Sequence, residues 1–244
     1  MSDVNKIAII GATGFGGLQL IRLLKEHPNF EISFLGGERS AGSKWNDLCP
    51  FLPLNEDPII QSPKPELISK VADFAVLSLP NGVASNLAPK LLEQNIRVLD
   101  LSADYRFRSL DQWREIYQPN SSKPRNDYRL CQEAIYGLPE LNFEDISIAK
   151  LVSCPGCFPT ASLLALIPFL RQGLIDLDGL IIDAKSGTSG GGRVPKEHLL
   201  FAECSDSISP YGVIGHRHTP EIEQISSQIA GHSIQLQFTP HLVP

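Results

Sequence analysis

The sequence has no long apolar run. The first apolar run, Ile7–Ile10, has only four residues. This is too short for the core of a secretory signal peptide or for a membrane span. No later stretch is long enough to cross a membrane either. We therefore expect a cytoplasmic protein with no membrane partner.

Basic charge is also scarce. The chain has 21 Lys and Arg residues against 27 Asp and Glu residues, which gives a formal net charge of −6. This balance leaves no basic stripe for a phosphate backbone, so we expect no nucleic-acid partner. A local basic pocket for a small anion remains compatible with it.

Neither a disulfide framework nor an internal repeat is indicated. The five cysteines are an odd number and follow no export signal, which favours reduced thiols. With 244 residues, of which 42% are hydrophobic, the chain is long enough for one large or two modest globular domains.

What the sequence does contain is an alternation of short apolar strands with amphipathic helices. This alternation of strands and helices is typical of an α/β domain with a parallel sheet and helices on both faces. Two segments interrupt it. Residues 40–70 are rich in Pro, Asn and Ser and predict loops, and residues 104–142 predict a long loop or an inserted helix. Strands are predicted over 6–10, 31–35, 74–79, 97–101 and 149–153, and helices over 15–26 and 87–94.

We place a domain boundary near residue 150, with one domain over 1–150 and a second over 151–244. Pro168 is expected to kink the first helix of the second domain or to leave a short separate piece. In this second domain, helices are predicted over 160–171 and 219–229, and strands over 179–184 and 233–238.

A glycine-rich turn, with the pattern G-x-x-G-x-x-G over 11–17, follows the first predicted strand and opens the first helix. Glycine lets the backbone approach a pyrophosphate closely, and the helix that follows directs its N–H groups at the phosphates. This context favours a dinucleotide-binding loop over a tight structural turn. The residues expected to contact the cofactor are Gly11, Thr13, Gly14, Phe15, Gly16 and Gly17.

The end of the second strand bears on which dinucleotide binds. Glu38 would suit the free ribose hydroxyls of NAD, whereas Arg39 with Ser40 would suit the 2′-phosphate of NADP. Spacing alone leaves this choice open, and it also leaves open that Arg39 is only a solvated surface residue.

Cys157 lies in the segment SCPGCFPT at 153–160, between a predicted strand and a predicted helix. Pro159 fits the first helical turn, where its missing N–H costs nothing. Cys157 is therefore expected just before the helix, where the helix dipole favours the nucleophilic thiolate. It is the candidate nucleophile.

Three other interpretations of Cys154 and Cys157 stay open. They can be a redox dithiol, half of a zinc site completed by His216 and His218, or two buried small apolar residues. A thioredoxin-like fold would not explain the glycine turn, and the sequence has no second C-x-x-C, so we expect no metal.

A candidate acid/base lies in GHRHTPEIEQ at 215–224. Thr219 is a good N-cap and Pro220 suits the first helical position, so His218 is expected just outside a helix start. The helix dipole disfavours a charged imidazole there, whereas a first-turn glutamate such as Glu221 favours it. This balance suits a proton donor and acceptor near neutral pH; a surface histidine is the alternative.

A second glycine-rich loop occupies 186–192. Its small residues can present backbone N–H groups to an anion, and Lys185, Arg193 or Arg217 can pair with a carboxylate or a phosphate. A flexible loop is the alternative interpretation.

Together these segments are far more specific than any one of them. The chain resembles the N-acetyl-gamma-glutamyl-phosphate reductases of arginine biosynthesis over essentially its whole length. The matching segments are GATGFGG at 11–17, LPNG at 79–82, LDLSADYR at 99–106, YGLPEL at 136–141, PGCFPT at 155–160, DAKSGTSGGGR at 183–193, GHRHTPEIEQ at 215–224 and FTPHLVP at 238–244.

The resemblance implies a Rossmann-type domain that binds NADP(H), followed by an α+β domain for catalysis and oligomer contacts. It implies the NADPH-dependent reduction of an acyl phosphate to a semialdehyde through a cysteine thioester, by a homo-oligomer that is a dimer or a tetramer. Catalysis is then the role of Cys157, His218 and Glu221. The resemblance adds Arg39, Ser40, Pro80, Ser186 and Gly187 to the cofactor site, and Arg106, Arg193 and Arg217 to the substrate site.

The chain departs from the family pattern in two places. Cys154 stands where the family usually has asparagine, and we hypothesise that oxidation pairs it with Cys157 and inactivates the enzyme; an activity loss under mild peroxide that reductant does not reverse would refute this. The match also stops at FTPHLVP, where family members continue. We therefore expect a C-terminally truncated member with weak stability and little activity, because an unfinished sheet leaves an exposed edge.

Two alternatives are kept. The first is a related acyl-phosphate reductase of the aspartate-semialdehyde or aminoadipate type, against which HRHTPEIEQ and SGTSGGGR favour the arginine enzyme. The second is a non-catalytic NADP-binding or zinc-binding module.

Overall fold

The computed structural model describes residues 4–118 and 125–244. The chain forms two compact units, Met1–Cys154 and Pro155–Pro244. They are called the N-terminal unit and the C-terminal unit below.

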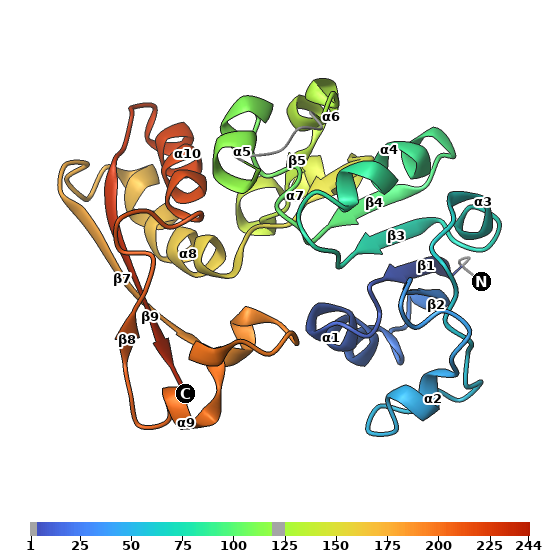
Figure 1. Cartoon of the computed structure of the whole chain (residues 1–244). Helices are drawn as coiled ribbons and strands as arrows, with labels where there is room; N and C mark the ends of the chain where they lie inside the picture. Colours follow the sequence, from blue (N-terminus) through green and yellow to red (C-terminus); the bar gives the residue numbers. More distant parts are fainter. Residues whose placement is uncertain (1–3, 119–124) are drawn as a thin grey trace. The chain divides into compact units, whose positions relative to one another are not determined.

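The N-terminal unit is built on a parallel sheet with the strand order β2-β1-β3-β4-β6-β5 (Figure 1). The strands predicted from the sequence are all present, with ends that differ by a few residues. The sheet also contains β5, which was not predicted from the sequence. The bounds of its strands are β1 (Asn5–Ile10), β2 (Phe30–Gly36), β3 (Phe74–Leu77), β4 (Arg97–Asp100), β5 (Ile135–Tyr136) and β6 (Leu151–Ser153).

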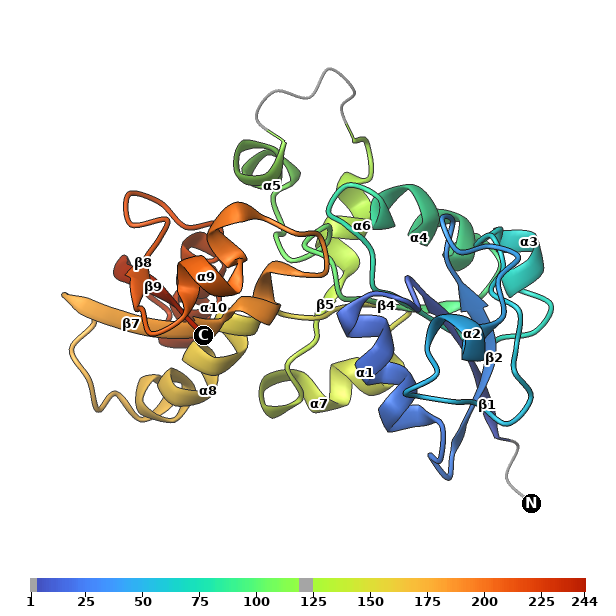
Figure 2. The ribbon, with the colours of Figure 1, turned by 60° about the horizontal axis from the view of Figure 1, so that its bottom comes forward.

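Both faces of this sheet are covered by helices, as Figures 1 and 2 show. Ala8 and Ile10 of β1 belong to a core that includes residues of α4 (Ala84–Glu93). Ile9 points the other way and packs in a second core with residues of α1 (Phe15–Leu24). Successive side chains of a strand point to opposite faces, so a run of buried residues such as 7–10 requires cover on both sides.

The prediction of loops over 40–70 is wrong in part, because α2 (Trp45–Leu48) and α3 (Pro65–Ile68) lie there. Each helix has four residues, which is too few to show a periodic pattern. Trp45 fixes α2, because its ring is fully buried and its Nε1–H donates to the Leu52 carbonyl at 2.8 Å. The later irregular region holds α5 (Leu110–Tyr117), α6 (Tyr128–Glu133) and α7 (Pro139–Ile148).

In the C-terminal unit, helices α8 (Cys157–Gln172) and α10 (Thr219–Ala230) pack against each other (Figure 1). Their sheet has the strand order β7-β9-β8, with β7 parallel to β9 and β8 antiparallel to it. The remaining elements are β7 (Leu180–Gly187), β8 (Ser209–Pro210), β9 (Leu236–Val243), α9 (Phe201–Cys204) and the short 3-10 helices η1 (Thr188–Gly191) and η2 (Glu197–Leu199).

Helix α8 is continuous through Pro168, so the expectation of a separate second piece is wrong. Pro168 and Leu164, whose carbonyl loses its usual helical partner, both lie on the exposed side of the helix. Water can therefore satisfy that carbonyl. Among the described residues, no helix is long and apolar enough to cross a membrane.

Candidate active site and cofactor site

The glycine loop, residues 11–17, lies where β1 ends and α1 begins. Strand β2 lies on one side of β1 and β3 on the other, so the chain reverses its direction of travel across the sheet at β1 and β3. Ligands of parallel α/β sheets bind at such a switch point, beyond the carboxyl ends of the strands. The loop after β3, which contains Pro80, lies at the same point.

Close packing requires glycine at several positions of this loop. Gly11 has a φ of +84°, and a Cβ there would lie 2.1 Å from the Ser78 carbonyl oxygen. A Cβ on Gly17 would lie 2.4 Å from the Gly11 carbonyl oxygen and 2.6 Å from that of Ala12. Because the obstacles are backbone atoms, a larger residue would displace the loop.

The start of α1 is suited to an anion. Gly14 is the N-cap, in an extended conformation with φ −73° and ψ 164°, and a glycine has no side-chain oxygen with which to cap the helix. The first turn, Phe15-Gly16-Gly17, contains no acidic residue. Its N–H groups and the positive end of the helix dipole therefore favour a phosphate.

Just after β2, Glu38 and Arg39 differ in their contacts: the Glu38 carboxylate is hydrogen-bonded within the protein, and Arg39 is exposed. The Ser62 hydroxyl donates to both carboxylate oxygens of Glu38, at 2.9 and 3.1 Å. Arg39 is exposed and Ser40 is half-buried in the adjoining turn. The carboxylate thus has a protein partner, while the next two residues offer a cation and a hydroxyl.

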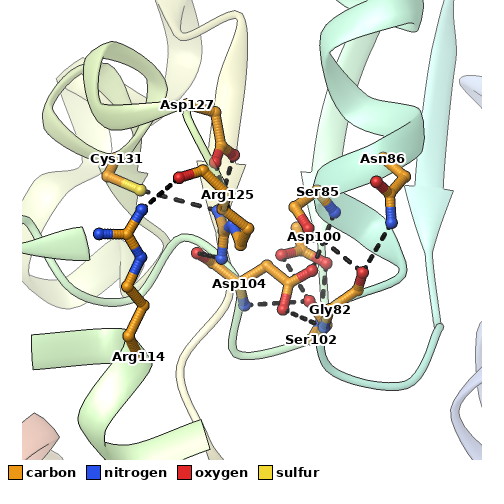
Figure 3. Close-up of polar contacts among 10 residues, drawn as sticks. All are labelled: Gly82, Ser85, Asn86, Asp100, Ser102, Asp104, Arg114, Arg125, Asp127 and Cys131. Carbon is orange, nitrogen blue, oxygen red and sulfur yellow. Dashed lines mark hydrogen bonds and ion pairs between the residues drawn. The ribbon is translucent and has the colours of Figure 1, made fainter. Parts of the chain in front are cut away.

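Asp104 holds the loop after β3 (Figure 3). Its side chain is fully buried, and its two carboxylate oxygens accept the backbone N–H groups of Gly82 at 2.6 Å and Ser85 at 2.8 Å. The Asn81 side chain in turn accepts the Ala103 N–H at 3.1 Å. The loops that follow β3 and β4 are therefore tied to each other, and Asp104 satisfies an N–H at the start of α4.

A second buried carboxylate, Asp100, lies beside this network. Ser102 donates to it through its backbone N–H at 2.9 Å and its hydroxyl at 2.8 Å. Burial, together with the nearby negative charge of Asp104, raises the pKa of Asp100 to about 7. The structure thus places near one another two buried carboxyl groups that sequence reasoning missed, although both lie in the matching segment LDLSADYR.

Arg125 supports Asp104 from the other side (Figure 3). Its guanidinium lies 4.2 Å from the centre of the Trp113 ring and pairs with Asp127 at 2.7 Å. It also donates to the Asp104 carbonyl at 2.8 Å. Cation–π and ion-pair contacts of this kind fix a side chain in one orientation.

Cys157 is the first residue of α8, and its side chain is exposed. Gly156 is the N-cap, since its carbonyl accepts the Thr160 N–H at 2.9 Å. The prediction that Cys157 lies just before the helix is wrong by one position. The reason is that Cys157 already has helical geometry, with Pro159 as the third helical residue.

Glu221 anchors the start of α8. It is fully buried in α10, and its Oε1 accepts the Gly156 N–H at 3.0 Å. The predicted role for Glu221 was to favour a charged His218. Its Oε1 contact is with the residue that precedes Cys157, and its role toward His218 stays a prediction.

Cys157 opens into a pocket of about 760 Å³, which is called the catalytic pocket below. It lies within the C-terminal unit, between the start of α8, the segment 186–211 and the turn before α10. Its lining residues are Cys157, Phe158, Ser186, Gly187, Gly190, Gly191, Lys196, His198, Leu199, Glu203, Cys204, Ser207, Ser209, Pro210, Tyr211, Gly215, His216, Arg217, His218 and Leu242.

His218 lies in the catalytic pocket together with Cys157. It is buried and is the N-cap of α10, because its carbonyl accepts the Ile222 N–H at 3.0 Å. The prediction of Thr219 as N-cap is therefore wrong. Thr219 is already helical, and its N–H is taken by the His216 carbonyl at 2.9 Å.

The other predicted site residues divide between the two units. Ser186, Gly187 and Arg217 line the catalytic pocket, whereas Arg193 is exposed and is not among its lining residues. In the N-terminal unit, Arg106 is buried and donates to the backbone carbonyls of Leu101 and Cys154, at 3.0 and 2.9 Å.

Sequence reasoning missed several groups of the catalytic pocket. His216 entered only as a zinc ligand, and Lys196, His198 and Tyr211 did not enter at all. Burial raises the pKa of Tyr211, and the nearby Cys157 raises it further. Lys196, His198 and Tyr211 come from segments without a regular pattern, so no sequence signal marked them, whereas His216 lies in the matching segment GHRHTPEIEQ.

Two observations bear on the alternative interpretations of Cys154 and Cys157 as part of a zinc site or as a redox dithiol. Over residues 4–118 and 125–244, His, Cys, Asp and Glu side chains form no group of three or more that could hold a metal ion. Burial and the charge of Asp100 raise the pKa of Cys154 to about 11, which makes its thiolate scarce at neutral pH. Its pairing with Cys157 under oxidation stays a prediction.

Comparison with known proteins adds independent observations. A family model described as the NAD binding domain of semialdehyde dehydrogenases matches residues 6–149, and one described as their dimerisation domain matches 157–244. The chain is 63% identical to N-acetyl-gamma-glutamyl-phosphate reductase of Prochlorococcus marinus (strain MIT 9313), over 100% of this chain and 69% of that relative. The chain belongs to the N-acetyl-gamma-glutamyl-phosphate reductase family. The protein of the same name from Parasynechococcus marenigrum (strain WH8102) is 62% identical over 98% of this chain and 67% of its own length.

Solved structures show the same fold. An aspartate semialdehyde dehydrogenase with NADP from Candida albicans superposes with a TM-score of 0.70 at 20% identity, over 99% of this chain and 68% of that one. Aspartate semialdehyde dehydrogenase II from Vibrio cholerae gives 0.69 at 17% identity, over 100% and 71%. The expected Rossmann-type domain followed by an α+β domain is thereby confirmed.

Proposed function

We propose that this chain carries out the NADPH-dependent reduction of N-acetylglutamyl 5-phosphate to the 5-semialdehyde and phosphate, the reaction named for its reductase relatives. The observation that carries the proposal is the placement of an exposed cysteine, Cys157, at the first position of a helix and in one pocket with His218. A thiolate nucleophile and an adjacent acid/base are the groups that thioester chemistry needs.

The residues of the N-terminal unit fit NADP(H). The glycine loop has the close backbone packing that a pyrophosphate site requires, and Gly14 leaves the start of α1 open to phosphate. Arg39 and Ser40 would hold the 2′-phosphate. Pro80 lies in the loop that Asp104 fixes at the switch point, and we propose Ser186 and Gly187 as contacts from the C-terminal unit.

In the mechanism, the Cys157 thiolate attacks the acyl carbon, a C–S bond forms, and the acyl C–O bond breaks to release phosphate. The helix dipole of α8 favours the thiolate, and the Cys157 N–H, outside the i→i−4 ladder, can donate to the thioester oxygen. NADPH, when bound, supplies a hydride to a carbonyl carbon. His218 then gives a proton to the sulfur as the C–S bond breaks, and it takes one from Cys157 before the next turnover.

Substrate recognition requires cations, because the substrate carries a carboxylate and a phosphate. Arg217 lines the catalytic pocket with Cys157 and is proposed to pair with one of these groups. The roles of Arg106 and Arg193 stay predictions. We further propose a homo-oligomer, dimer or tetramer, in line with the description of the second matched domain as a dimerisation domain.

The test is the reverse reaction, the phosphate-dependent reduction of NADP by N-acetylglutamate semialdehyde. Activity is expected with this semialdehyde and not with aspartate semialdehyde. Cys157→Ser should lower the rate by at least about 1,000-fold, whereas Cys49→Ala, in the core of the N-terminal unit, should stay within about threefold. Equal activity of Cys157→Ser and the parent chain would refute the proposal.

A further inference from the structure

His216 lies at the centre of a cluster of rings beside the nucleophile. Its half-buried imidazole packs against side chains from α8, the segment before α10, and β9. The distances from its ring centre are 5.7 Å to Phe158, 5.6 Å to Tyr211, 4.9 Å to His218 and 5.2 Å to Phe238.

A hydrogen bond defines how this ring is protonated. The backbone N–H of His218 donates to Nδ1 of His216 at 3.2 Å. Nδ1 must be unprotonated to accept, so the proton of the neutral ring is on Nε2. His216 is therefore neutral in this arrangement.

The surroundings of His216 maintain that neutral state. Burial lowers its pKa to about 4, and the positive charge of the neighbouring Arg217 adds to this effect. The other titratable side chains in ring contact with it are Tyr211 and His218. His216 therefore does not exchange protons near neutral pH, although it lies only two residues from the proposed acid/base.

We propose that His216 is a positioning residue for His218, an inference that rests on the proposed function. Its Nδ1 fixes the backbone of His218 where α10 begins, and its ring, at 72° to that of His218, fixes the imidazole edge to face. Because Phe158, which follows Cys157, contacts both imidazoles, the same cluster fixes the acid/base relative to the nucleophile. Catalytic groups need this support to keep a productive distance.

Two substitutions separate the hydrogen bond from the ring packing. His216→Phe keeps an aromatic ring and removes the acceptor, whereas His216→Asn keeps an acceptor oxygen near Nδ1 and removes most of the ring. We expect His216→Phe to lower kcat by about tenfold, which is about 1.4 kcal/mol in the activation free energy. KM for NADP should be unchanged, and His216→Asn should recover part of the loss.

The pH profile of kcat excludes a merely structural role. In His216→Phe, the limb of the pH profile that reports His218 should shift along the pH axis, because the His218 imidazole is no longer held in place. An unchanged profile and an unchanged kcat would overturn the proposal. A His216→Asn variant that has lost the limb altogether would also overturn it, since His216 would then be the acid/base.

A measurement without turnover keeps this inference distinct from the proposed function. In ¹⁵N NMR spectra of the histidine rings, His216 should show an unprotonated Nδ1 and should not titrate between about pH 5.5 and 8. Titration of His216 within that range would refute the inference even if the enzyme is active. The predicted spectrum in a chain without reductase activity would instead count against the proposed function alone.

Discussion

Helix α1 of the N-terminal unit and helix α8 of the C-terminal unit both begin directly after a short turn, and both have glycine at the N-cap. Gly14 has φ −73° and ψ 164°, and Gly156 has φ −65° and ψ 161°. Neither first turn contains an acidic residue. Neither N-cap has a side-chain oxygen that caps the first turn, so the dipole at each helix start favours a negative charge there.

Two other helices show the contrast. The start of α5 is capped by the Ser109 hydroxyl, which accepts the Gln112 N–H at 3.2 Å. The start of α4 is satisfied by the buried carboxylate of Asp104. A side-chain oxygen at this position satisfies the helix but competes with an incoming anion.

The two glycine-capped helix starts differ in where the anion comes from. At α1 it is proposed to arrive with the cofactor, and the surrounding glycines keep side chains out of its way. At α8 it is proposed to be the thiolate of the first helical residue, so bulky Phe158 and Pro159 are tolerated. In the C-terminal unit, the N-cap residue Gly156 is held by Glu221 of α10, whose carboxylate accepts the Gly156 N–H.

The largest effect that would sharpen this comparison is expected at Gly17. In Gly17→Ala, the new Cβ meets two backbone carbonyls at 2.4 and 2.6 Å, so the loop must move and NADPH should bind at least about tenfold more weakly. Gly16→Ala is the matched comparison, because its Cβ meets the Ser78 hydroxyl at 2.6 Å, which can rotate away. Thermal melts and fluorescence titration with NADPH measure both variants; equal loss of melting temperature in the two would contradict this account of the loop.

A smaller effect, on stability and rate but not on NADPH affinity, is expected at Glu221. Glu221→Ala should lower the free energy of unfolding by about 1–3 kcal/mol, because the Gly156 N–H loses its buried partner. The rate should fall by about tenfold with unchanged NADPH affinity, and Glu221→Gln, which keeps an acceptor, should recover most of the stability. Urea unfolding and steady-state kinetics test this, and a loss of NADPH affinity in Glu221→Ala would break the division of roles between α1 and α8.

The smallest effect concerns Asp100 and pH. Its pKa is about 7 in the folded state, against 3.8 for an aspartate side chain in water, so the folded state binds the extra proton between these values. Stability from this group is fully present below about pH 4 and is lost as the pH rises to about 7. The free energy of unfolding of Asp100→Asn should therefore rise relative to that of the parent chain, by on the order of 1 kcal/mol between pH 5 and 8. Urea unfolding at several pH values measures this difference. A difference that does not change with pH would contradict the raised pKa.

The class of fold was predictable from local sequence features. The strand at 6–10, the glycine loop and the helix after it form one local pattern, and the same holds for Cys157 at the start of its apolar helix, within one residue. These features are predictable because periodicity and glycine geometry act over a few residues.

The remaining features depend on contacts between segments far apart in the sequence. Asp104 caps a helix that begins twenty residues earlier in the chain, and Glu221 binds a residue 65 positions away. The ring cluster around His216 joins segments from 158 to 238. Such contacts leave no periodic trace, so the sequence alone singled out Cys157 and His218 as candidates but did not predict the contacts that hold them.

The most direct test of the central claim is to trap the acyl-enzyme. The chain is mixed with N-acetylglutamate semialdehyde and NADP in the absence of phosphate, so that the thioester forms but has no phosphate to receive the acyl group. The account predicts a burst of NADPH equal to the enzyme concentration, and mass spectrometry should find the N-acetylglutamyl adduct on Cys157. An adduct on another residue, or turnover with phosphate in which no adduct on Cys157 forms, would contradict it.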